Sequence, residues 1–297
     1  MANGPYFGHV VTAMVTPFDD QLRVDEEQVV ALAKHLVANG SDGLVVCGTT
    51  GESATLTAAE KVRLYSLVQE AVGGDACVIA GTGSNNTAES ISLTQAAEQA
   101  GVAGVLVVGP YYNKPSQEGM YQHFKAIGES TKLPVMLYNV PGRTISNIAP
   151  ATVKRLADDV PNILSVKEAS SDLAQIATIA SQAGRGFEIY SGDDFTTLPI
   201  LAVGGVGVVS VVSHIIGKDL LRMHELFFEG DLEGARAIHL KQMALSKAIF
   251  CATNPVPVKY AMEYLGIIKK ANYRLPMIEA TAEEKHIVVD ALEAYGL

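Results

Sequence analysis

Lys167 is the residue whose type and position point most directly to chemistry. It follows the apolar run 163–166 in the register of a strand, so alternation places Ser165 and Lys167 on one face. We expect that face to be dry, and an amine taken out of water has a lowered pKa. A neutral amine condenses with ketones to form a Schiff base. The pattern therefore predicts imine chemistry. The alternative is a lysine paired with a carboxylate such as Glu168, which should point to the opposite face.

Imine chemistry also needs groups that move protons, and Tyr138 and Thr49 are the candidates. Tyr138 ends the neighbouring apolar run, and its phenol can both donate and accept a proton. Thr49 lies in the glycine-flanked turn 48–53, where its hydroxyl could relay a proton between two phenols. The backbone amides of Thr49, Thr50 and Gly51 could hold a carboxylate, because such turns form anion nests. The alternatives are a core tyrosine with a satisfied hydroxyl and an ordinary turn threonine.

Arg143 is a candidate for binding a carboxylate at the mouth of such a site. It follows a Pro-Gly pair shortly after Tyr138, and a guanidinium grips a carboxylate through two parallel hydrogen bonds. The alternative is a surface arginine in a loop. No metal site is expected, because the sequence contains no HxH, HExxH or CxxC pair. Asp193 and Asp194 form the one candidate pair for a hard cation, and Asp194 is equally suited to cap the next helix.

Eight short β-branched runs alternate with longer amphipathic stretches, and their ends carry these residues. Continuous apolar runs of this kind fit parallel strands buried on both faces. Eight strand–helix units predict an α/β fold of the (β/α)8 TIM-barrel class, in which active residues lie at the carboxyl ends of the strands. A doubly wound open sheet is the competing fold, but its GxGxxG fingerprint does not occur. The predicted strands are 10–15, 43–47, 77–81, 105–108, 134–138, 163–166, 187–190 and 206–212.

The remaining stretches predict helices and a division of the chain. Thr57 and Glu60 have the spacing of a capping box at the start of one helix. We expect the barrel to occupy residues 1–230 and a C-terminal helical extension to occupy 231–297. The predicted barrel helices are 25–39, 58–72, 87–100, 116–130, 150–159, 172–183, 195–203 and 219–229. The predicted helices of the extension are 232–250, 257–265 and 283–295.

Composition narrows the classes of partner and compartment. The 297 residues are 48% hydrophobic, which is enough for a sizeable core, and the net charge of −10 disfavours nucleic acid, whose binding needs a basic face. Three scattered cysteines suit a reducing cytoplasm, and the first residues lack the basic and apolar regions of a signal peptide. The uncharged stretch 196–217 contains a proline and several glycines, so a short helix, a turn and a strand fit it better than a membrane span.

Seven ordered motifs give the sequence a specific resemblance to the dihydrodipicolinate synthase family of pyruvate-dependent class I aldolases. The resemblance covers essentially the whole chain, and ordered motifs are far more specific than any single glycine-rich tripeptide. The motifs are GTTGESATL at 48–56, AGTG at 80–83, PYYNKPSQEG at 110–119, LYNVPGRT at 137–144, VKEA at 166–169, SGDD at 191–194 and NPVPVK at 254–259.

The resemblance implies a homotetrameric lyase that needs no cofactor. It would condense pyruvate with L-aspartate 4-semialdehyde to give 4-hydroxy-tetrahydrodipicolinate, in lysine (diaminopimelate) biosynthesis. Lys167 would carry the pyruvate imine and Tyr138 would donate and accept protons. Thr49 and Tyr112 would complete the proton relay, with Tyr112 reaching in from a partner subunit.

Substrate binding is implied by the same resemblance. Thr50 and Val209 would contact pyruvate, Gly192 would belong to the substrate site, and Arg143 would hold the carboxylate of the semialdehyde. Sister branches that cleave sugar acids, of the N-acetylneuraminate or 2-keto-3-deoxy-gluconate type, share the lysine, the tyrosine and the turn. They generally lack the arginine, so the sugar-acid reaction is the alternative.

The resemblance also implies a candidate regulatory site. Feedback-sensitive members of the family bind lysine in a cleft at a dimer interface, and the matching residues here are Ser53, Ala54, Asn85, Glu89 and Tyr111. Ala58 and Lys61, however, stand where some sensitive members have histidines. Because Lys61 adds a like charge near a cationic effector, we expect lysine to inhibit weakly or not at all.

Overall fold

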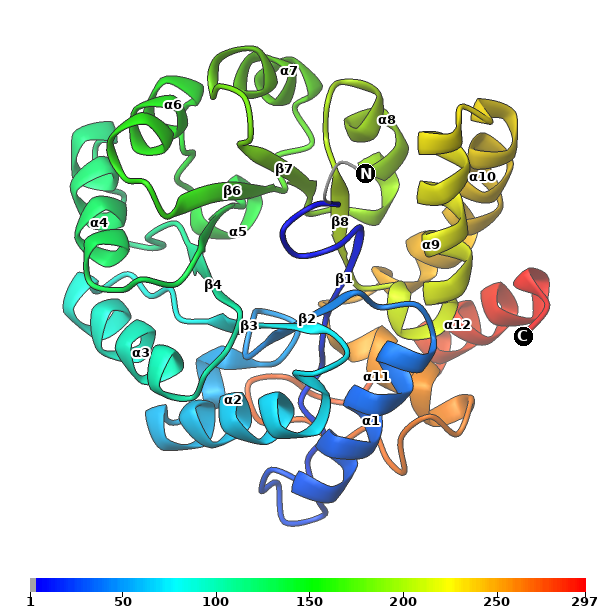
Figure 1. The fold of residues 1–297 in the computed structure, drawn as a ribbon. Helices are drawn as coiled ribbons and strands as arrows, with labels where there is room; N and C mark the ends of the chain where they lie inside the picture. Colours follow the sequence, from blue (N-terminus) through cyan, green and yellow to red (C-terminus); the bar gives the residue numbers. More distant parts are fainter. Residues whose placement is uncertain (1–3) are drawn as a thin grey trace.

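Eight parallel strands close into a barrel in sequence order, β1 to β8, with β8 pairing back onto β1. The structure is a computed structural model and describes residues 4–297. Figure 1 shows the strands at the centre with the helices around them. The predicted TIM barrel is therefore confirmed. The strands are β1 Val10–Ala13, β2 Gly43–Val46, β3 Cys77–Gly81, β4 Gly104–Val108, β5 Val135–Asn139, β6 Ile163–Glu168, β7 Glu188–Ser191 and β8 Gly207–Ser210.

Alternation along each strand separates two apolar layers. Side chains such as Val166 and Leu137 pack outward under the helices. Side chains such as Val209, Met136 and Ile79 fill the barrel interior as a separate cluster. Both faces are dry, which explains why the strands appear in the sequence as continuous apolar runs.

The helices lie outside the strands and follow the predicted positions closely. The capping box at Thr57 is present, since its hydroxyl accepts from the Glu60 amide and the Glu60 carboxylate accepts from the Thr57 amide. The last barrel helix begins at Ser213, earlier than predicted, and is kinked at Ile216. The helices are α1 Glu26–Ala38, α2 Ala58–Val72, α3 Thr87–Gln99, α4 Gln117–Glu129, α6 Pro150–Asp159, α7 Leu173–Gln182, α8 Thr197–Ala202 and α9 Ser213–Glu229.

The uncharged stretch 196–217 contains a short helix, a turn and a strand, as predicted. Helix α8 ends at Ala202, Gly204 turns the chain with a φ of +109°, and β8 follows within the barrel. Only glycine adopts such a backbone readily. Across residues 4–297, no helix combines the length and apolarity needed to cross a membrane.

Three further helices follow the barrel: α10 Leu232–Ile249, α11 Val256–Tyr264 and α12 Ala282–Tyr295. Helix α10 packs against α9 and α12, and α11 contacts α9 and α12 as well. Figure 1 shows this group on one side of the barrel, close to α1 and α9. The predicted helices of the extension are confirmed, and the division at residue 230 stays a prediction.

Candidate active site

Lys167 lies at the carboxyl end of β6 and faces the barrel interior, as alternation predicts. Its neighbour across the sheet is Tyr138 on β5, and its Nζ lies 4.2 Å from the centre of the Tyr138 ring. The side chain is buried, with 6% of its surface exposed. No carboxylate of residues 4–297 forms an ion pair with this amine.

Glu168 points to the other face of β6, so the alternative pairing with Lys167 is wrong. Its carboxylate accepts hydrogen bonds from Asn139 Nδ2 at 3.0 Å, from the Ser170 amide at 2.9 Å and from Gln175 Nε2 at 3.1 Å. Burial raises the pKa of Glu168, while these donors act in the opposite direction. The amine and the nearest carboxylate in sequence are thereby kept apart.

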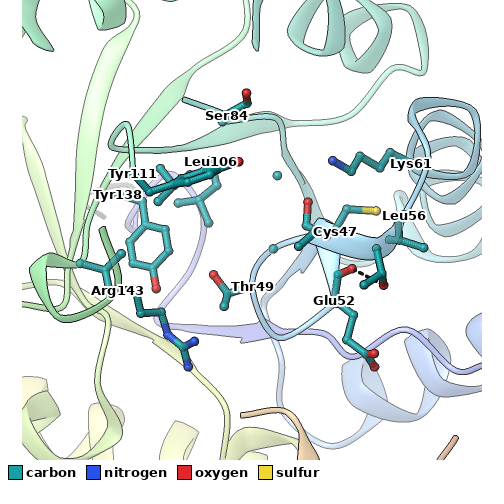
Figure 2. A pocket seen from close by; sticks show the side chains of 18 of the residues that line it. Cys47, Thr49, Glu52, Leu56, Lys61, Ser84, Leu106, Tyr111, Tyr138 and Arg143 are labelled. Atoms are coloured by element: carbon teal, nitrogen blue, oxygen red, sulfur yellow. Dashed lines mark hydrogen bonds between the residues drawn. The ribbon is translucent and has the colours of Figure 1, made fainter. Parts of the chain in front are cut away.

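A cavity of about 430 Å³ opens at the carboxyl ends of the strands, and Tyr138, which packs on the Lys167 amine, forms part of its wall. Tyr138, Thr49 and Arg143 line it, and Figure 2 shows their side chains around the same space. Lys167 itself is not part of the lining, because it lies against the face of the Tyr138 ring. The cavity therefore combines a phenol, a hydroxyl and a cation next to a buried amine, as reaction at a small keto acid requires.

The turn 48–53 after β2 is a rigid, hydrogen-bonded structure. The Gly51 amide donates to the Gly48 carbonyl at 3.1 Å, and the Glu52 amide donates to the Thr49 carbonyl at 3.1 Å. The expectation that the Gly51 amide takes part in an anion nest is therefore wrong, because that donor is used within the turn. Thr50 is buried, and its hydroxyl accepts a hydrogen bond from Asn254 Nδ2 at 2.9 Å.

Arg143 lies on a single helical turn, α5 Pro141–Thr144, rather than in an irregular loop. The turn is closed by the Arg143 amide, which donates to the Val140 carbonyl at 2.9 Å, and by the Thr144 hydroxyl, which donates to the Ser146 carbonyl at 2.7 Å. The side chain is exposed and makes no ion pair within residues 4–297. Its guanidinium is therefore available to an anion that enters the cavity.

Tyr112 points away from the cavity of its own chain. Its side chain is 87% exposed and its φ is +73°, an uncommon value for an aromatic residue. The loop around it is nevertheless fixed, because Asn85 Nδ2 donates to the Tyr111 carbonyl at 3.1 Å and Asn113 Nδ2 donates to the Asn85 carbonyl at 2.9 Å. This hydrogen-bonded loop therefore presents the exposed Tyr112 side chain outward.

Gly192 directly follows β7, beside the strand that carries Lys167, and Val209 lies on β8. A Cβ on Gly192 would come within 2.6 Å of the Ala169 Cβ and within 3.1 Å of the Lys167 Cγ, so any larger residue there must displace its neighbours. The Gly192 amide donates to the Glu168 carbonyl at 2.8 Å. Val209 is buried on β8 among the inward side chains. Both residues are close-packed, and neither lines the cavity.

A family model and individual relatives match nearly the whole chain. The model of the dihydrodipicolinate synthetase family matches residues 6–295. This chain belongs to that family. The 4-hydroxy-tetrahydrodipicolinate synthase of Bacillus subtilis (strain 168) is 53% identical over 279 residues, which cover 94% of this chain and 96% of that protein.

Solved structures of family members share the fold. The dihydrodipicolinate synthase of Cyanidioschyzon merolae, solved with lysine bound, is 46% identical with a TM-score of 0.97 and covers 99% of each chain. The chloride-inhibited dihydrodipicolinate synthase of Acinetobacter baumannii, complexed with pyruvate, is 35% identical with a TM-score of 0.94 and covers 98% of this chain and 99% of that one.

Four of the five residues predicted from the family for lysine binding line the same cavity. Ser53, Ala54, Glu89 and Tyr111 line it, whereas Asn85 does not and instead binds the Tyr111 backbone. Ser84 also lines the cavity, and its hydroxyl donates to the Glu89 carboxylate at 2.7 Å. Lys61 lies in the same lining, as Figure 2 shows, so its positive charge is close to the residues predicted to bind a cationic effector.

Asp194 has a different role from the one that the sequence suggested. It is Asp193 whose carboxylate caps the next turn, accepting from the Phe195 amide at 2.8 Å. Asp194 is buried and accepts from the Val211 and Val212 amides at 3.0 and 3.1 Å. The two carboxylates therefore serve separate backbone amides, and residues 4–297 contain no group of three or more metal-ligating side chains.

Sequence patterns do not identify two of the residues that contact the site. Asn254 lines the cavity and binds Thr50, and the Lys259 amine reaches the carboxylate of Glu52 in the turn. Both lie in the NPVPVK motif at 254–259, which carried the family resemblance but no assigned role. The motif was a visible signal, although its contacts span more than 200 positions of sequence and have no periodic pattern.

Proposed function

We propose that this chain condenses pyruvate with L-aspartate 4-semialdehyde through a Schiff base on Lys167, giving 4-hydroxy-tetrahydrodipicolinate in lysine (diaminopimelate) biosynthesis. The observation that carries the proposal is the Lys167 amine, buried at the carboxyl end of a barrel strand and beside Tyr138. The name of the Bacillus subtilis relative and the pyruvate in the Acinetobacter baumannii structure support it.

Imine formation requires the amine to attack the keto carbon and water to leave. Each stage moves a proton, and Tyr138 is the nearest candidate, because its ring packs on the amine and it lines the cavity. Thr49 shares that lining and would pass the proton onward. Tyr112 would complete the relay in the cavity of a neighbouring subunit, which its outward position allows. This exchange requires at least a dimer, and we propose the homotetramer that the family resemblance implies.

The two substrates would occupy different depths. Pyruvate would bind at the deep end, towards the amine and towards Thr50, Val209 and Gly192, which lie behind the residues that line the cavity. The semialdehyde carboxylate would bind Arg143, whose guanidinium lies at the cavity wall without an internal partner among residues 4–297. The chemistry needs no cofactor, because the imine that pyruvate forms with the lysine amine itself acts as the electron sink. We propose a cytoplasmic location.

Arg143 also separates this reaction from sugar-acid cleavage. We expect turnover of pyruvate with the semialdehyde, and none of N-acetylneuraminate or 2-keto-3-deoxy-gluconate. Arg143→Ala should raise the KM for the semialdehyde by roughly 10- to 100-fold, the worth of a charge-assisted hydrogen-bonded pair. Arg185→Ala is the matched control, since Arg185 is also exposed but lies outside the cavity. Preferred turnover of a sugar acid would contradict the proposal.

A further inference from the structure

Segment 254–259 contacts the turn 48–53 at two points, although the two are about 200 residues apart in sequence. Asn254 reaches Thr50 near the beginning of the turn, and Lys259 reaches Glu52 near its end. Thr49 directly precedes Thr50 in the turn and lines the cavity. The segment therefore borders the catalytic turn from outside the barrel sheet.

The contact at the end of the turn is a fully buried ion pair. The side chains of Lys259 and Glu52 are 1% and 2% exposed. Lys259 Nζ also donates to the Asn272 carbonyl at 2.8 Å and lies 4.4 Å from the centre of the Phe18 ring. Burial lowers the pKa of Lys259 to about 8, and the contact with Glu52 opposes that shift by favouring the charged amine. Its donors are directed at protein groups, which leaves no role for it as a nucleophile.

The buried pair acts on a strained point of the backbone. Glu52 has a φ of +55°, in the left-handed region that non-glycine residues avoid. Its amide donates to the Thr49 carbonyl, and its second carboxylate oxygen accepts from the Arg274 amide at 3.3 Å. Such a conformation persists only when its surroundings over-determine it. The ion pair supplies that constraint, and the constraint reaches Thr49 through the backbone.

The contact between Asn254 and Thr50 determines where the Thr50 hydroxyl can donate its hydrogen. A threonine hydroxyl has one hydrogen to donate and two lone pairs to accept with. Because Asn254 Nδ2 donates to the Thr50 oxygen, that hydrogen is free to be donated elsewhere. Asn254 is itself buried, and its Oδ1 has no hydrogen-bond partner among residues 4–297.

We propose that Asn254 and Lys259 are positioning residues for the reaction: Lys259 fixes the turn 48–53 through Glu52, and Asn254 sets the Thr50 hydroxyl as a donor to the pyruvate carboxylate. This inference rests on the proposed function. Neither residue touches the reacting atoms. Each acts through a residue of the turn, and their loss should raise the KM for pyruvate in folded enzyme.

The buried pair is tested by comparing single and double variants. Lys259→Met and Glu52→Gln each leave one buried charge without its partner and should lower the Tm. The double variant removes both charges and should regain much of the lost Tm. We expect the KM for pyruvate to stay raised in the double variant by roughly tenfold, the effect of one lost hydrogen-bonded contact. Lys270→Met, in the exposed pair with Asp20, is the matched control and should change neither quantity. A double variant with wild-type KM and kcat would overturn the inference.

The Asn254 contact is tested by a double-mutant cycle. Asn254→Asp replaces the donor by an acceptor, so the Thr50 hydroxyl would donate to the new carboxylate instead of to pyruvate. We expect a roughly 10- to 100-fold rise in the KM for pyruvate. In a Thr50→Val background the same change should have a markedly smaller effect, since the shared hydroxyl is gone. Equal effects in both backgrounds would overturn the role of the hydroxyl.

Borohydride trapping separates failure of this inference from failure of the proposed function. If the unaltered enzyme yields no reduced pyruvate adduct, the proposed function fails and the inference fails with it. If the unaltered enzyme is trapped, and the folded variants are trapped at the same pyruvate concentrations as the unaltered enzyme, the inference alone is wrong. A shift of half-maximal trapping to higher pyruvate concentration in the variants supports it.

Discussion

Gly192→Ala tests whether the barrel wall sets the position of the Lys167 amine. Gly192 does not have a left-handed φ, so an alanine meets no backbone strain there and any effect comes from its methyl group. That methyl would be 2.6 Å from the Ala169 Cβ, 3.1 Å from the Glu168 carbonyl oxygen and 3.1 Å from the Lys167 Cγ. All three neighbours belong to β6 or directly follow it, and one of them is the stem of the lysine.

The size of the effect follows from these contacts. Carbon atoms pack at about 3.5–4.0 Å, so the methyl needs roughly 1 Å more room beside Ala169 and about half as much beside Lys167. Overpacking of this kind costs about 1–3 kcal/mol of unfolding free energy. The flexible lysine stem gives way more easily than backbone, and a displacement of about 1 Å at a reacting group costs about 10²-fold in rate. Because the lysine stem needs only about half that displacement, we expect kcat to fall by roughly tenfold.

The assay compares kcat, the rate of borohydride trapping with pyruvate, and the Tm. The matched control is Gly74→Ala, because a Cβ on Gly74 would have no heavy atom within 4 Å. The control should leave all three quantities unchanged, whereas Gly192→Ala should slow trapping and turnover together. An alanine at 192 with wild-type kcat and Tm would refute the reasoning that this wall positions the amine.

Three further predictions concern proton transfer, acid stability and regulation. Tyr138→Phe should lower kcat by about 10²-fold or more, the usual worth of a general acid–base group, with little change in Tm; wild-type kcat would exclude the phenol as the proton carrier. The His214 ring accepts from the Val15 amide at 3.1 Å and contacts the Val211 carbonyl at 2.7 Å, and burial lowers its pKa from 6.5 to about 4. Because the unfolded chain binds this proton more tightly, up to about 3 kcal/mol of unfolding free energy should be lost as the pH falls from 6.5 through 4. The amide of His214→Gln can make both hydrogen bonds, so urea unfolding of this variant should show an unfolding free energy that depends less steeply on pH in that range. An equally steep dependence on pH would contradict the assignment to His214. L-Lysine should inhibit weakly or not at all, and Lys61→Ala should strengthen its binding; sub-millimolar inhibition of the unaltered enzyme would show that the Lys61 charge does not oppose the effector.

The barrel and its central lysine are predictable from the sequence because their cause is local. Strands buried on both faces leave continuous apolar runs, and alternation along residues 163–166 alone places Lys167 inward and Glu168 outward. Motifs at strand ends then indicate Tyr138, Thr49 and Arg143, which the structure brings to one cavity. Each of these predictions uses only short-range periodicity and the rule that strand ends carry the site.

Contacts between distant segments have no such signal. The sequence does not show that Lys259 is buried against Glu52, that Asn254 binds Thr50, or that Asp193 rather than Asp194 caps the turn after β7. Each depends on how loops pack after the barrel closes. The use of the Gly51 amide inside its own turn likewise depends on the left-handed conformation of neighbouring residues, which sequence reasoning did not anticipate.

The most direct test of the central claim is borohydride reduction in the presence of pyruvate, followed by peptide mass mapping. The account predicts one lasting adduct per chain, with the mass of pyruvate less one water plus two hydrogens, on the peptide that contains Lys167. Lys167→Ala should give no adduct and no turnover. An adduct on another lysine, or normal turnover by Lys167→Ala, would contradict the account.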